Sequence, residues 1–117
     1  LIVMGVLTYV TLAILAWRMG FRLSLAGVPM GIDINAVRGR LEAMPGVARL
    51  HDLHVWPMST TETALTAHLV IPAGYPGDGF LMEAAHAMRD DFGIGHVTLQ
   101  VETDAAAACS LVPDNVV

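Results

Sequence analysis

The chain has 117 residues, a formal net charge of −5 and a single cysteine, Cys109. This length suffices for one small domain and one additional element. The basic residues are all arginines and form no basic patch, which argues against nucleic-acid binding, whereas an acidic domain attracts cations. One cysteine cannot form an internal disulfide, so nothing indicates an oxidising compartment.

The N-terminal segment, Leu1 to Trp17, is uncharged and almost wholly apolar. A helix needs about 20 such residues to cross a bilayer. Because the sequence does not begin with Met, we expect a fragment whose membrane helix is truncated at its start. Trp17, Arg18 and Arg22 form an interfacial anchor with a positive flank. The positive-inside rule then places the residues after 18 in the cytoplasm, with membrane lipid around residues 1–20.

The rest of the chain shows two helical and three strand patterns. Apolar spacing, turn residues and period-two alternation predict a helix over 34–44, strands over 47–56 and 63–71, a helix from about 80 to about 93, and a strand over 97–102. This order predicts an α+β fold of ferredoxin-like type, an α-β-β-α-β domain with both helices on one sheet face. We expect the domain to span 27–103, after a membrane helix and juxtamembrane segment over 1–26 and before a flexible tail over 104–117.

Histidines and carboxylates gather on the predicted strands. The candidate metal ligands are His51, His68, His96 and Glu102, with His54 and Asp52 as secondary candidates. Such side chains are the ligands that zinc and related cations prefer. Strict alternation places His54 rather than His51 beside His68, but a bulge or a strand start near His51 would reverse this. A polar sheet face that binds no metal is the alternative interpretation.

Several segments, in this order along the chain, resemble one family. They are Gly27-Val28-Pro29 with Gly31-Ile32-Asp33, Pro45-Gly46-Val47 with His51-Asp52-Leu53-His54-Val55-Trp56, Leu65-Thr66-Ala67-His68, and the segment from Phe92 to Glu102. Behind an apolar helix, they are similar to the cation diffusion facilitators, and especially to the zinc-transporting branch. These membrane antiporters export zinc and related divalent cations from the cytosol in exchange for protons.

The resemblance implies the last transmembrane helix and C-terminal cytoplasmic domain of a zinc-type divalent metal/proton antiporter, which is not an enzyme. It implies a homodimer in a membrane, which we expect to be a bacterial inner membrane. The metal would be Zn²⁺ or another divalent ion such as Cd²⁺ or Co²⁺, bound near the dimer interface to regulate transport. The positions matching His51, His68, His96 and Glu102 supply its ligands, which favours His51 over His54. Asp52 and Gln100 are then outer-shell candidates.

The chain departs from the family pattern at three points. Ala26 stands where members often carry an acidic residue, and Cys109 lacks the partner cysteine of a Cys-x-x-Cys tail. The family's transport site lies on its second and fifth membrane helices, which this sequence does not contain. The alternative function is a metal-independent dimerisation scaffold of the same transporter.

Overall fold

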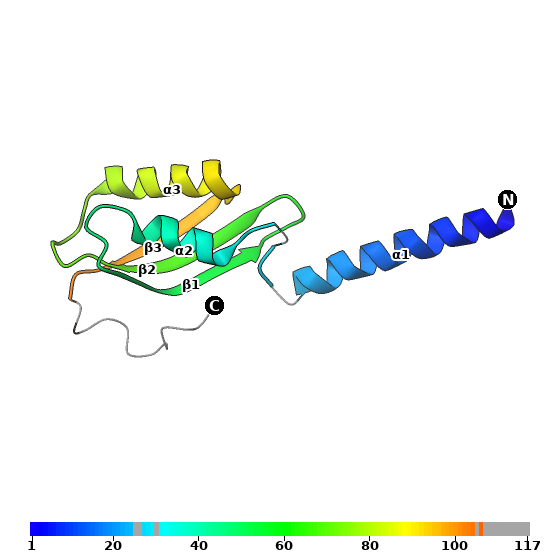
Figure 1. The fold of residues 1–117 in the computed structure, drawn as a ribbon, viewed down its shortest axis with the longest axis horizontal. Helices are drawn as coiled ribbons and strands as arrows, with labels where there is room; N and C mark the ends of the chain where they lie inside the picture. The colour runs from blue at the N-terminus through cyan, green and yellow to red at the C-terminus, as the bar shows by residue number, and fades with distance from the viewer. Residues whose placement is uncertain (25–26, 30, 105, 107–117) are drawn as a thin grey trace.

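The structure, a computed structural model, describes residues 1–24, 27–29, 31–104 and 106. The elements in chain order are α1 (Ile2–Ser24), α2 (Ile34–Glu42), β1 (Arg49–Pro57), β2 (Thr63–Val70), α3 (Asp78–Phe92) and β3 (His96–Glu102). The predicted α-β-β-α-β order behind an apolar helix is confirmed (Figure 1). Most of the tail predicted to be flexible lies outside the described residues, so that prediction stays untested.

Helix α1 stands apart from the domain (Figure 1). Its segment Ile2–Phe21 is long and apolar enough to cross a membrane, and none of it is buried within the chain. The hydroxyls of Thr8 and Thr11 donate to the carbonyls of Met4 and Leu7, at 2.9 and 2.8 Å. These bonds satisfy the two hydroxyls inside the helix, so neither would need water in an apolar environment.

The domain is one three-stranded sheet with the order β1-β2-β3, covered on one face by α2 and α3 (Figure 1). β1 and β2 form an antiparallel hairpin, whereas β2 and β3 are parallel. Parallel neighbours need a crossover connection, which α3 supplies here. Because both helices lie on the same face, the other face of the sheet is available for polar chemistry.

Local signals in the sequence set where the helices begin and end. Asp33 caps α2 by accepting from the backbone N–H groups of Asn35 and Ala36, at 2.9 and 3.4 Å. Gly93 ends α3 in the left-handed conformation, with φ at 70°. The two helices then bury their apolar stripes against the inner sheet face. The largest fully buried apolar side chains are Leu41, Leu53, Leu65, Leu69, Met88, Ile94, Val37 and Val70.

Candidate metal centre

A β-bulge in β1 decides which side chains reach the outer face of the sheet. The pairing between β1 and β2 shifts between His51 and His54, and Asp52 has a φ of 51°. The extra residue offsets the alternation, so that Leu50 and Leu53 both join the core although they are three positions apart. His51 and His54 consequently both lie on the outer face. Strict alternation favoured His54 as the neighbour of His68, and the bulge places His51 opposite His68 instead.

Three side chains from the three strands converge on the outer face. His51 lies directly opposite His68 in the β1–β2 pair, and their rings meet edge to face with centroids 5.1 Å apart. Glu102, at the end of β3, lies one diagonal step from His68. His51 donates from Nε2 to Oε2 of Glu102, and His68 donates from Nδ1 to Oε1, each at 2.9 Å. The potential ligand atoms of these residues all lie within 4.8 Å of one another.

The cluster is shielded from water. The His51 side chain is fully buried, and those of His68 and Glu102 are 18% and 13% exposed. Gln100 donates from Nε2 to Oε1 of Glu102 at 3.2 Å, which helps to orient the carboxylate. Nδ1 of His51 has no hydrogen-bond partner within the described part of the chain. A buried polar atom without a partner is costly in a protein interior.

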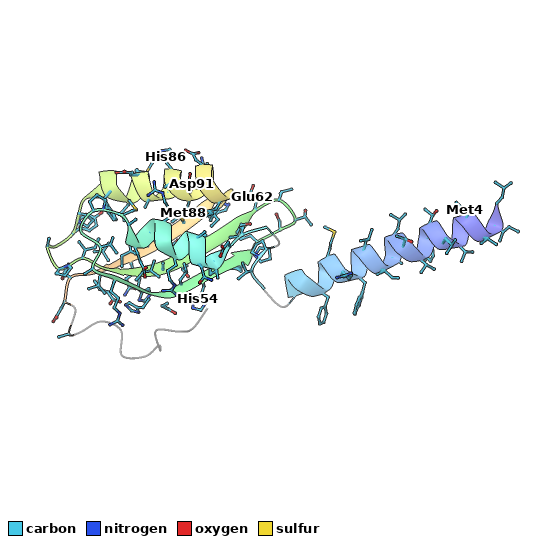
Figure 2. The ribbon with its side chains drawn as sticks, viewed as in Figure 1. Met4, His54, Glu62, His86, Met88 and Asp91 are labelled. Atoms are coloured by element: carbon cyan, nitrogen blue, oxygen red, sulfur yellow. The ribbon has the colours of Figure 1, made fainter. Side chains whose placement is uncertain are left out.

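The two secondary candidates extend the cluster along β1. His54 donates from Nε2 to Oδ1 of Asp52 at 2.8 Å, and Oδ2 of Asp52 lies 3.4 Å from Nε2 of His68. Figure 2 shows His54 on the sheet face opposite α3, the helix that carries His86. Asp52 therefore touches the cluster through the far nitrogen of His68, whereas His54 touches Asp52.

His96 lies elsewhere. It opens β3, six residues before Glu102, which corresponds to roughly 20 Å along an extended strand. Its Nε2 faces Oε2 of Glu62 in the β1–β2 turn at 3.3 Å, and both side chains are more than half exposed. Ligation by His96 stays a prediction, and it would need donors other than this cluster. Sequence reasoning missed the contact with Glu62, because no spacing links a hairpin turn to the start of a strand after a helix.

The donor set of His51, His68 and Glu102 suits a borderline divalent cation. Two imidazole nitrogens and one carboxylate oxygen are ligands that zinc takes, and three protein donors leave a further position for another donor. The hydrogen bonds to Glu102 already hold the three groups together, so an ion that replaced the two shared protons would need little rearrangement. The residues present therefore fit a zinc-type ion.

Comparison with known proteins agrees with this chemistry. The family model described as "Cation efflux protein, cytoplasmic domain" matches residues 29–104. The metal cation efflux system protein CzcD of Cupriavidus metallidurans is 38% identical over 79 residues, which are 67% of this chain and 25% of CzcD. The bovine (Bos taurus) protein named "Probable proton-coupled zinc antiporter SLC30A3" is 35% identical over 81 residues, 69% of this chain and 21% of that protein.

A solved structure resembles the domain as well. The metal-bound C-terminal domain of the CzcD transporter from C. metallidurans aligns with a TM-score of 0.56 and 38% identity, covering 61% of this chain and 99% of that one. The chain therefore belongs to the cation efflux, or cation diffusion facilitator, family, through its C-terminal cytoplasmic domain. That family comprises transporters rather than enzymes, as the sequence indicated. The chain spans about a quarter or less of the length of these curated relatives.

Proposed function

We propose that this chain is the last membrane helix and regulatory cytoplasmic domain of a zinc-type divalent cation/proton antiporter. The observation that carries the proposal is the convergence of His51, His68 and Glu102 from three strands on one shielded spot. Support comes from family membership, from a relative named as a proton-coupled zinc antiporter and from the metal-bound CzcD domain. Helix α1 would span the membrane and leave the residues after Arg18 in the cytoplasm.

In this proposal His51, His68 and Glu102 hold Zn²⁺, or a related ion such as Cd²⁺ or Co²⁺, when its cytosolic concentration rises. The name of the matching family model, ZT_dimer, supports assembly into a homodimer. Three ligands leave room for a donor from the partner subunit or from water. An ion bound more tightly by one arrangement of two subunits stabilises that arrangement, and the linked membrane helices respond through this coupling free energy.

The test uses the 117-residue chain in detergent micelles. Zinc binding is measured by calorimetry and subunit association by sedimentation, for the wild type and His68→Ala. The matched control is His86→Ala, because His86 is an exposed histidine on the opposite side of the domain. Binding that is lost with His68 but retained in the control, and that tightens the dimer, supports a metal-sensing domain. Association that is identical with and without zinc in all three proteins leaves a metal-independent scaffold instead.

A further inference from the structure

The outer sheet face holds a chain of alternating imidazoles and carboxylates that continues beyond the three proposed ligands. Glu102 accepts from His51 through one oxygen and from His68 through the other. Asp52 repeats this arrangement: one oxygen accepts from His54 at 2.8 Å and the other lies 3.4 Å from Nε2 of His68. His68 is therefore placed between two carboxylates, with Nδ1 toward Glu102 and Nε2 toward Asp52.

We propose that Asp52 is the positioning residue of the metal centre, holding the imidazole of His68 so that its Nδ1 faces the ion. This inference rests on the proposed function. An imidazole that ligates a metal through one nitrogen carries its remaining proton on the other, and a carboxylate at that nitrogen fixes both the tautomer and the ring orientation. In His68 that second nitrogen is Nε2, and Oδ2 of Asp52 lies 3.4 Å from it.

The backbone at Asp52 explains how one residue reaches the ring of His68 from the neighbouring strand. In a regular strand, Asp52 and His51 would point to opposite faces of the sheet. The positive φ of Asp52 creates the bulge that brings both side chains to the outer face. His54 secures the remaining oxygen of Asp52, so the carboxylate is held between two imidazoles. Its own side chain is only 18% exposed, which limits competition from water.

Asp52 has two possible roles: its backbone adopts the left-handed conformation of the bulge, and its carboxylate lies beside His68. Two substitutions separate the conformational role from that of the carboxylate. Asn and Gly both tolerate a positive φ, so Asp52→Asn and Asp52→Gly keep the bulge. Asn offers one carbonyl oxygen, which accepts from His68 or from His54 but not from both, and its amide group donates. Gly offers no acceptor at all. Asp90→Asn is the control, because Asp90 is exposed on α3.

The experiment measures zinc affinity of the 117-residue chain in micelles, by competition with a chromophoric chelator, for these variants and the wild type. We expect Asp52→Gly to bind zinc about 10- to 100-fold more weakly, Asp52→Asn to fall between it and the wild type, and Asp90→Asn to match the wild type. In zinc-loaded wild type, nitrogen–proton correlation spectra should place the ring proton of His68 on Nε2. The same spectra of Asp52→Gly should lose that slowly exchanging proton.

The possible outcomes distinguish failure of the Asp52 proposal from failure of the proposed metal centre. Both Asp52 variants binding zinc within about twofold of the wild type would overturn the role of Asp52 and leave the metal centre standing, because outer-shell partners normally matter more than this. A wild type that binds no zinc would overturn both proposals. Weaker binding accompanied by loss of the β-sheet amide pattern in both variants would show a structural role and overturn positioning.

Discussion

Replacing Glu102 by Gln should reveal how much the cluster of His51, His68 and Glu102 contributes to the stability of the fold, with and without metal. The carboxylate accepts from His51 and from His68, one imidazole at each oxygen. Gln keeps the shape but has one acceptor oxygen, so one of these two bonds is lost and its imidazole faces an amide donor. A hydrogen bond to a charged group contributes about 1.5–3 kcal/mol, and Glu102 is only 13% exposed, so little of this is screened.

Without zinc, Glu102→Gln should therefore lower the free energy of unfolding by about 2 kcal/mol, which is roughly 8–16 °C in melting temperature for a domain of this size. Zinc at about 100 times its dissociation constant should stabilise the wild type by about 2.7 kcal/mol, and the variant much less, because a charged ligand is missing. Thermal melts followed by circular dichroism, with chelator and with zinc, measure both effects. Glu83→Gln, at an exposed position on α3, is the control and should shift stability by less than about 0.5 kcal/mol. If zinc raised the melting temperature equally in the wild type and in Glu102→Gln, ligation by Glu102 would be refuted. If the two proteins had the same melting temperature in chelator, the hydrogen-bond argument would be refuted.

Three other outcomes are expected. Zinc affinity should fall from about pH 7.5 to about pH 5.5, because protons compete for imidazole, and calorimetry showing no change would contradict histidine ligation. The hydrogen bond from Tyr75 to Asp78, at 2.5 Å, raises the pKa of Tyr75, so Asp78→Asn should lower that pKa toward its ordinary value in an ultraviolet titration of the phenol. The hydrogen bond from the neutral phenol stabilises the folded state at low pH, and this stabilisation is lost as the pH rises through the raised pKa of Tyr75. An unchanged pKa of Tyr75 in Asp78→Asn would contradict the role of the hydrogen bond. Leu53→Ala, which removes a fully buried side chain, should destabilise the domain by about 2–5 kcal/mol in chemical denaturation, whereas a loss below about 1 kcal/mol would mean that the core relaxes around it.

The fold was predictable because its signals are local and agree with one another. The Asp33 cap, the Gly93 stop and the apolar alternation of Val97, Leu99 and Val101 each act within a few residues, and all three are found in the structure. The element order then admits few arrangements. The element ends moved by one or two residues, since helix and strand termini depend on caps and pairing as well as on periodicity.

The residue types of the site were predictable from the sequence, but the strand register that brings these residues together was not. Residue types alone indicated imidazole and carboxylate chemistry, and the resemblance selected His51, which the structure places directly opposite His68. Alternation instead favoured His54, because it assumes that side chains along a strand point to opposite faces in turn, with no bulge residue between them. A single left-handed residue, Asp52, breaks this assumption, and Asp is one of the few residues other than Gly that adopts this conformation readily. That tolerance is the one local signal that could have indicated the bulge.

The same bulge makes the proposed centre a cross-link of the whole sheet. Without it, His51 would point toward α2 and α3, so β1 could not supply this ligand to an ion at Glu102. With it, the cluster takes one side chain from each strand, at the end of β3 where the chain leaves the domain. An ion held there opposes separation of β3 from β2 and of β2 from β1 together, so zinc should protect the amides of all three strands from hydrogen exchange. Protection confined to β2 and β3 would mean that His51 is not a ligand, however tightly the domain binds zinc.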